Sequence, residues 1–381
     1  MNKKEISEIK KILVPDNGYL SINNILTAYI DPSKTISYKA NRTFGIIPES
    51  ESSILMEIFK KSLSGTLGKG IREYSFTDKA YDENEFQPIA TKLVNSQLKD
   101  AEACDEMLSK IVTFANYPSA YYIAIGSFSY SVPAEKKNKD DEVEDTGEIY
   151  NFIITAICPV ALTDMGLYFN EKDKIIEKKT NTDFVVAKAP SDAFLFPVFS
   201  GRTSDVNNVL YYTKTPKKPN TGIITDILGC EFVRTADEEK NIFVSIMSES
   251  FEDNLDCETF NSINSKLLNI LEENKKETEI TTIGLNELKM ILKASKVPDN
   301  IIEKFEGSYK EKIGSDGEKL TLCNIIDTSK ISMTAPDITI NAKNEISDKI
   351  RTEIINGQKC IVIGLDEPTV VLNGIDINAG N

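Results

Sequence analysis

The order in which strand-like and helix-like segments follow one another constrains this chain more than any single motif does. Two apolar segments rich in aromatic and β-branched residues, 120–132 and 149–162, are separated only by a polar, charged stretch. Strands with no helix between them pair as antiparallel neighbours, whereas parallel strands need a long crossover connection. The sequence therefore predicts two long, neighbouring antiparallel strands in the middle of the chain.

Helical periodicity is found in other parts of the chain, where apolar residues recur every three or four positions. The expected helices are 3–13, 51–63, 84–95, 100–115 and a helical segment over 236–310 that is broken at Val297-Pro298. The other expected strands before residue 235 are 19–30, 35–47, 183–189, 194–199 and 208–214.

The last part of the chain, 320–377, has the character of β structure again. Asn356-Gly357 stands between two apolar runs, which is a strong signal for a two-residue hairpin turn. Within 330–343 the alternation shifts register across Pro336, which predicts a bulge or an edge strand.

Strands and helices are thus segregated along the chain, which argues against a doubly wound βαβ fold. We predict an α+β protein with a mixed or antiparallel sheet and flanking helices, a helical middle segment and a small β-rich C-terminal unit. The expected division is an α+β core domain over 1–235, a helical segment over 236–312 and a small β-rich domain over 313–381.

The charge of the chain limits its partners. The 381 residues carry 59 acidic and 44 basic side chains, a net charge of −15, so we expect no binding to a nucleic-acid backbone. The N-terminal segment lacks the apolar core of a secretory signal, and the most apolar window, 152–169, is too interrupted to span a bilayer. Six cysteines scattered singly are typical of a reduced, cytoplasmic protein.

The absence of histidine excludes several classes of chemistry. With no histidine in the chain, Ser–His–Asp and Cys–His catalysis and every histidine-ligated metal centre are impossible. Any reaction would have to use carboxylates, Lys, Tyr, Cys or a hard cation bound by carboxylates. We therefore expect no cofactor and no metal site, and favour a protein that is not an enzyme.

The segment 194–214 looks most like a site, because an apolar run ends at Gly201 and is followed by Arg202, Asp205, Tyr212 and Lys214. One interpretation is a metal-dependent phosphodiesterase, although Tyr212 stands where a second acid would be needed. Another is a binding loop in which Arg202 binds a carboxylate or phosphate of a partner. The third, which we favour, is a local Arg202–Asp205 ion pair closing a turn.

Three other features have a plain structural explanation beside the functional one. The stretch 64–70 resembles a phosphate-binding loop, but its spacing and context fail, and helix termination explains Gly65 and Gly68 equally well. The acidic stretch 135–148 could bind calcium, although a solvated hairpin tip is the simpler interpretation. Cys158 lies in an apolar run, which favours a core thiol over a nucleophile.

Several segments together carry a family resemblance: MNKKEISEIKK, IFKKSLSGTLGK, ICPVAL, FLFPVFSGRTSDVNNVLYYTK and NGQKCIVI. In order and over essentially the whole chain, they resemble a family of cytoplasmic proteins from clostridia and related Firmicutes that is catalogued as a domain of unknown function, number 4317. The resemblance implies no activity, cofactor or catalytic residue, and it supports the cytoplasmic location. The segment 21–35 departs from it, because many relatives carry a cysteine-containing strand there.

Two functions of different classes follow from these observations. The first is a non-catalytic cytoplasmic binding or assembly protein, with a protein partner or self-association through exposed β-hairpins. The alternative is a histidine-free, metal-dependent hydrolase or phosphodiesterase that uses carboxylates around Asp205. A weaker third idea is an acidic protein that mimics nucleic acid and occupies the groove of a basic partner.

Overall fold

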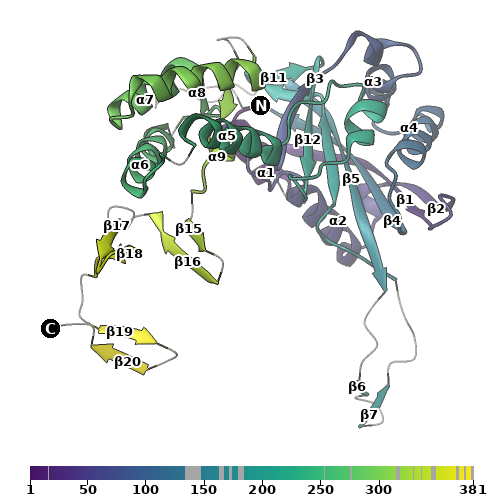
Figure 1. Cartoon of the computed structure of the whole chain (residues 1–381). Helices are drawn as coiled ribbons and strands as arrows, with labels where there is room; N and C mark the ends of the chain where they lie inside the picture. The colour runs from purple at the N-terminus through teal and green to yellow at the C-terminus, as the bar shows by residue number, and fades with distance from the viewer. Residues whose placement is uncertain are drawn as a thin grey trace, which may run out of the picture. The chain divides into compact units, whose positions relative to one another are not determined.

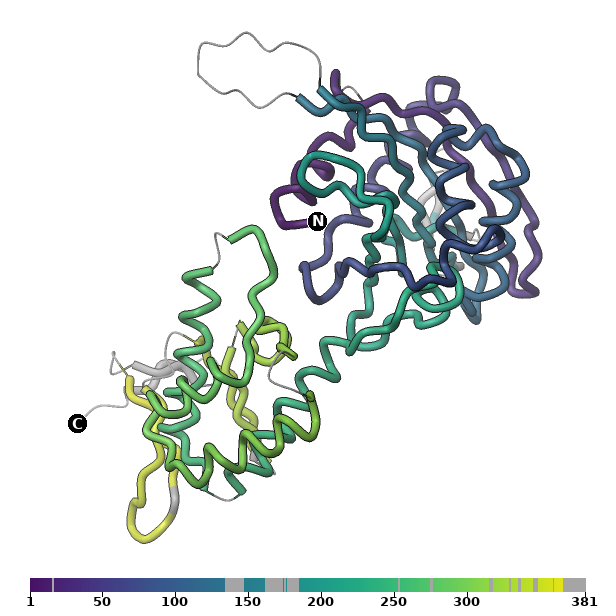
Figure 2. Tube along the Cα trace, turned by 90° about the horizontal axis from the view of Figure 1, so that it is seen from above, coloured from purple at the N-terminus to yellow at the C-terminus, as the bar shows by residue number. Residues whose placement is uncertain are grey.

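The fold is described from a computed structural model of the chain. It describes residues 1–15, 17–133, 147–162, 167–170, 174–178, 184–252, 254–274, 277–314, 318–328, 330–335, 337–344, 349–365, 369–372 and 375–378. The chain divides into two compact units, Met1–Thr235 and Ala236–Asn381. Unit 1 is the purple-to-teal part of the tube in Figure 2, and unit 2 is the green-to-yellow part.

Unit 1 is built on one large antiparallel sheet with the strand order β2-β1-β4-β5-β9-β12-β3, and β8 pairs with the end of β5. Its strands are β1 (Leu20–Ile30), β2 (Ile36–Thr43), β3 (Ile71–Ser75), β4 (Tyr121–Ser131), β5 (Ile149–Leu162), β8 (Phe184–Val186), β9 (Asp192–Phe196) and β12 (Asn208–Thr213). Two smaller pairs of unit 1 are β6 (Leu167–Asn170) with β7 (Ile175–Lys178), and β10 (Val198–Ser200) with β11 (Thr203–Asp205).

The central pair, β4 and β5, is antiparallel along the whole of β4, from Tyr121 opposite Pro159 to Ser131 opposite Ile149. This confirms that 120–132 and 149–162 are neighbouring strands. Neither strand contains a charged residue, and from Tyr121 to Phe128 and from Phe152 to Cys158 nearly all side chains are buried, on both faces. The connection between them, which contains the candidate calcium site at 135–148, lies largely outside the described residues.

Helices cover both faces of the sheet, so unit 1 has three layers (Figure 1). One face packs against α3 (Phe86–Ser96), α4 (Ala101–Phe114) and the π-helical η3 (Ile223–Ile227). The other packs against α1 (Lys3–Ile12) and α2 (Glu49–Lys61). The short 3-10 helices are η1 (Phe44–Ile46) and η2 (Asp78–Tyr81).

Local sequence signals explain where two of these helices begin. The Asn2 side chain accepts hydrogen bonds from the backbone amides of Lys4 and Glu5, and the Glu5 carboxylate accepts one from the Asn2 amide, which completes a capping box at α1. Asp100 caps α4 by accepting from the amide of Ala103.

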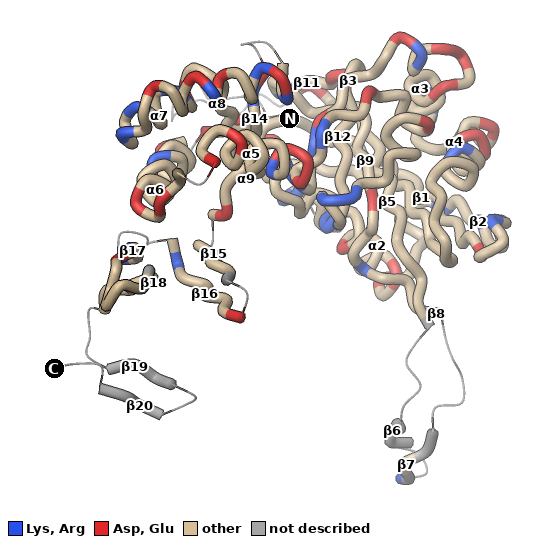
Figure 3. Tube along the Cα trace, viewed as in Figure 1, with Lys and Arg blue, Asp and Glu red and all other residues tan. Residues whose placement is uncertain are grey.

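Unit 2 contains helices around their own apolar core. They are α5 (Ala236–Phe251), α6 (Cys257–Glu273), α7 (Leu285–Ala294), α8 (Asp299–Lys312) and the short α9 (Leu322–Ile325), with β13 (Thr282–Ile283) paired to β14 (Leu320–Thr321). Pro298 is the N-cap of α8, which confirms the helix break expected at Val297-Pro298. Figure 3 shows acidic and basic residues interspersed along α7 and α8.

Three two-stranded hairpins follow in unit 2, and they lie one after another along the chain. They are β15 (Lys330–Ala335) with β16 (Ile338–Lys343), β17 (Ile350–Ile355) with β18 (Gln358–Ile363), and β19 (Thr369–Leu372) with β20 (Ile375–Asn378). Asn356 and Gly357 both have positive φ, as a two-residue hairpin turn of type I′ requires, so the Asn-Gly prediction is confirmed.

The region around Pro336 refines one expectation, which was a bulge or an edge strand. Ala335 pairs with Ile338, so the segment 330–343 is two strands of a hairpin and not one bulged strand, and each is an edge of its two-stranded sheet among the described strands. The alternation changes because the chain reverses direction there, and Pro336 itself lies outside the described residues.

The α+β class, with its large antiparallel sheet and flanking helices, is confirmed. The division into three parts stays a prediction. The core of unit 2 includes Phe305 and Tyr309 from before the expected boundary at 312/313, and Leu320 and Ile325 from after it.

Gly126 in β4 gives a test of how tightly α2 packs on the sheet. A Cβ atom at this position would lie 2.7 Å from the ring of Phe128 and 2.9 Å from that of Phe59 on α2. We expect Gly126→Ala to lower the free energy of unfolding by about 1–3 kcal/mol through overpacking, measured by urea denaturation.

Gly45→Ala is the matched control, because a Cβ atom there meets nothing within 4 Å. It should change the free energy of unfolding by less than about 0.5 kcal/mol. An equal effect of the two substitutions would show that packing around Gly126 is not the cause.

Candidate functional site

The segment 194–214 forms β9, a short hairpin and β12. In the hairpin, Ser200 pairs with Thr203, and the two turn residues Gly201 and Arg202 have φ values of +56° and +66°. A two-residue turn of this type needs both central residues in the left-handed region, which glycine adopts freely and arginine only at a cost. Arg202 is therefore held by contacts outside the turn.

Helix α1 and the segment after β4 supply those contacts. The Glu5 carboxylate accepts a hydrogen bond from the amide of Gly201 at 2.8 Å, and Arg202 Nη1 lies 3.6 Å from Glu8 Oε1. Arg202 also donates from Nη2 to the carbonyl oxygen of Pro133 at 2.5 Å. Glu8 in turn accepts from the Tyr130 hydroxyl at 2.8 Å. The contacts of Arg202 thus fasten the hairpin to α1 and to the end of β4.

Asp205 does not pair with Arg202, so the expected local ion pair is not what closes the turn. Its two carboxylate oxygens accept from the amide of Asn207 at 2.9 Å and from Asn208 Nδ2 at 2.6 Å, within the link to β12. Aspartate side chains in turns commonly accept hydrogen bonds from backbone amides two residues further on, and Asp205 does this instead of pairing with Arg202.

Lys214 lies at the far end of β12 from Asp205. The six residues of β12 separate them by roughly 20 Å at the usual rise of a strand. The Lys214 amide donates to the carbonyl of Ser191, and its side chain is exposed. The structure therefore does not bring Arg202, Asp205 and Lys214 together, and a binding role for each stays a prediction.

Tyr211 and Tyr212 point to opposite faces of the sheet, as neighbours on a strand must. Tyr212 packs half-buried against the core on the α1/α2 side, and burial raises the pKa of its hydroxyl. Tyr211 is buried on the α3/α4 side, where it meets a polar group that the sequence analysis did not single out.

That group is Asp192, the first residue of β9, whose side chain is buried in the sheet face toward α3 and α4. The hydroxyls of Tyr117 and Tyr211 each donate to one of its carboxylate oxygens. The Tyr211 hydroxyl also accepts from the amide of Asn220, and Asn220 Nδ2 donates to the carbonyl of Ala115. The network joins β9, β12, the loop before β4 and the loop before η3.

The electrostatics of this network follow from its burial. Desolvation raises the pKa of Asp192, and the hydrogen bonds from Tyr117, Tyr211 and Thr213 oppose that shift. Burial also raises the pKa of Tyr117 and of Tyr211, and the Asp192 carboxylate beside them adds to the effect. Both hydroxyls accordingly keep their protons and act as donors. The only sequence signal was a lone aspartate before the apolar run AFLFPVF.

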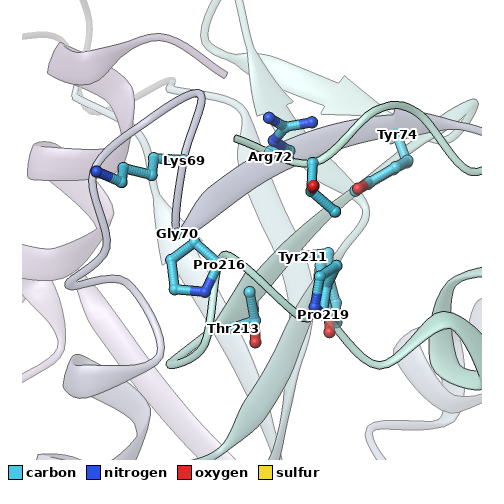
Figure 4. Close-up of a pocket in the computed structure, with 9 residues that line it drawn as sticks. Lys69, Gly70, Arg72, Tyr74, Tyr211, Thr213, Pro216 and Pro219 are labelled. Atoms are coloured by element: carbon cyan, nitrogen blue, oxygen red, sulfur yellow. The ribbon is translucent and has the colours of Figure 1, made fainter. Parts of the chain in front are cut away.

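A small cavity adjoins Tyr211 (Figure 4). Its volume of about 10 Å³ is at the lower limit for holding a single ordered water molecule, which is too small for a substrate or cofactor. It is lined by Lys69, Gly70, Arg72, Tyr74, Tyr211, Thr213, Pro216, Pro219 and Thr235. The Lys69 ammonium group points away from Tyr211 and Thr213 in Figure 4.

The phosphate-loop-like stretch 64–70 contributes to this cavity through Lys69 and Gly70. Strand β3 follows it directly, so no helix N-terminus faces the loop as a phosphate site would need. Helix termination does not explain the glycines either, because α2 ends at Lys61 with Ser62 as its C-cap. Instead, Gly68 has a φ of +85°, and a Cβ at Gly65 would lie 2.8 Å from the backbone of Gly70.

Clusters of possible metal ligands and the Cys158 thiol are two further candidates for chemistry in the described part of the chain. No group of three or more Asp, Glu or Cys side chains is placed there to hold a metal ion. Cys158 is buried, and burial raises the pKa of its thiol to about 12, as expected for a core cysteine. Over the same residues, no helix has both the length and the apolar character to cross a bilayer.

A wider hollow lies in unit 2, lined by residues of α5, α6, α9 and β15, with a volume of about 410 Å³. The sequence analysis placed the lining residues before 310 in a helical segment and those after 320 in β structure. It did not predict the hollow, because periodicity shows which side of a helix is apolar but not what covers it.

Tyr211→Phe tests whether the Asp192 network stabilises unit 1. The substitution removes a donor to the buried carboxylate and an acceptor for the Asn220 amide, so we expect a loss of about 1–3 kcal/mol in the free energy of unfolding. Tyr212→Phe, on the opposite face of the same strand, is the control and should cost less than about 0.5 kcal/mol. Similar losses in urea denaturation would contradict a special role for the network.

Comparison with known proteins agrees with the whole-chain resemblance. No curated protein matches the chain. The family model described as a domain of unknown function (DUF4317) matches residues 1–375, which is nearly the full length. The chain therefore belongs to the DUF4317 family.

Proposed function

We propose that this protein is a non-catalytic cytoplasmic assembly protein that self-associates through the free edge of β18. The observation that carries the proposal is the hairpin β17–β18, a two-stranded sheet in which β18 has β17 as its one neighbour among the described strands. Two strands alone are marginally stable in water, and a third strand at the open edge would stabilise them.

The composition of β18 suits pairing at this edge. Its sequence, QKCIVI, has one charged residue in six and is rich in β-branched residues. Ile361 on β18 is 49% exposed and Ile354 on β17 is 78% exposed, so both leave apolar surface in water. An apolar edge without a neighbouring strand is the kind of surface that recruits another strand.

A second copy of the same strand is the occupant that we propose, because the register of the hairpin makes the edge self-complementary. Ile355 pairs with Gln358 beside the two-residue turn, so the backbone groups of Gln358, Cys360 and Val362 face β17. Those of Ile361 and Ile363 then face outward. An antiparallel two-fold pairing centred on Ile361 buries this side chain against its own counterpart.

The cytoplasmic part of the proposal is supported by six free cysteines, three of them buried. The net charge of −15 disfavours nucleic-acid backbones as partners. The alternative of a metal-dependent hydrolase around Asp205 gains no support from the geometry, because both oxygens of that carboxylate bind within their own turn.

Charge pairs introduced at the position of Ile361 test the proposed interface. Ile361→Lys places two lysines opposite each other across the two-fold axis, and Ile361→Glu places two glutamates there. We expect each variant to raise the dimer dissociation constant by about tenfold or more, measured by sedimentation velocity over a range of concentrations. Mixing the two variants should restore the dimer, because the lysine of one copy then faces the glutamate of the other.

Ile46→Lys is the control, since Ile46 is 73% exposed but lies in η1 of unit 1. It should leave the dimer unchanged. A wild-type protein that remains monomeric at the highest concentration, or a mixture that stays as weak as the single variants, would refute the assembly proposal.

A further inference from the structure

The groove of unit 2 is a second place where the described structure leaves apolar surface uncovered. With a volume of about 410 Å³, it falls within the range of small-molecule pockets. It is lined by Lys240, Phe243, Val244, Met247, Ser248, Leu255, Phe260, Ile263, Asn264, Leu267, Ile325, Ile326, Asp327, Lys330, Ile331 and Ser332.

The walls of the groove are mainly hydrophobic. They include the aromatic ring of Phe243 on α5, Leu267 on α6 and Ile325 on α9. Val244 and Phe260 are 51% and 41% exposed, so part of the wall meets solvent directly. Water in such a hollow gains few hydrogen bonds, so an apolar molecule of matching shape would replace it favourably.

In the lining, basic residues outnumber acidic ones, whereas acidic residues are in excess over the whole chain. The charged lining residues are two lysines, Lys240 and Lys330, and one aspartate, Asp327, in a protein with a net charge of −15. Asp327 Oδ1 accepts a long hydrogen bond of 3.3 Å from the Lys330 amide. The two lysines leave the lining with a net positive charge, which favours a ligand with an anionic group.

We propose that this groove binds a fatty acid, with its alkyl chain along the apolar walls and its carboxylate near Lys240 and Lys330. A methylene group occupies about the volume of a water molecule, roughly 30 Å³, so the groove holds on the order of a dozen carbon atoms. This site is separate from the strand edge of β18 and does not depend on self-association.

The absence of tryptophan from the chain allows a direct binding measurement. Phe260→Trp puts a single tryptophan on the lining, and its emission can be followed during titration with saturated fatty acids below their micelle concentrations. We expect saturable binding that tightens about fourfold for each added methylene and levels off near a dozen carbons. Dodecanol, which has the same chain without the carboxylate, should bind at least tenfold more weakly than dodecanoate.

Two sets of variants, each with its own control, locate the site by calorimetric titration with dodecanoate and dodecanol. Lys240→Met and Lys330→Met should each weaken dodecanoate but not dodecanol, whereas Lys293→Met on α7, outside the lining, should change neither. Val244→Trp should fill the groove and weaken binding at least tenfold. Val233→Trp in unit 1, with a similar exposure of 47%, should have no effect.

Several results would overturn this assignment. They are no saturable binding at any chain length, equal affinity for dodecanol and dodecanoate, or binding that survives Val244→Trp. Tryptophan emission that shifts with protein concentration and not with fatty acid would show instead that a segment of a second copy fills the groove.

Discussion

Unit 1 depends on the burial of both faces of its central strands. Antiparallel sheets often leave one face to water, and their strands then alternate between apolar and polar residues. Strands β4 and β5 carry no charged residue, and they are buried on both sides. Such a pair is stable only if helices cover each face, which α1 and α2 do on one side and α3, α4 and η3 on the other.

The same constraint explains why buried polar groups in unit 1 are hydrogen-bonded. A carboxylate in the interior of a covered sheet must be hydrogen-bonded or it destabilises the fold. Asp192 meets this requirement through Tyr117 and Tyr211, which come from different elements. Arg202 and Asp205, which look like a functional pair in the sequence, are likewise used for local structure, by α1 and by the turn before β12.

In unit 2, apolar surface is covered less completely. Its helices share one core, but the groove beside α5 and α6 and the edge of β18 leave apolar groups accessible. Uncovered apolar surface of this extent marks sites of interaction more often than it is tolerated without a role. For this reason the proposals on assembly and on fatty-acid binding both lie in unit 2.

The sequence by itself determined the α+β class, the central antiparallel pair, the helix break at Pro298 and the Asn356-Gly357 turn. These features depend on periodicity and on the backbone preferences of a few residues, which act over short distances. Tertiary structure alone decided that Glu8 and not Asp205 faces Arg202, that Asp192 lies between two tyrosines, and that a groove opens beside α5. Those contacts join residues far apart in the chain, and no local pattern encodes which distant side chain completes a pair.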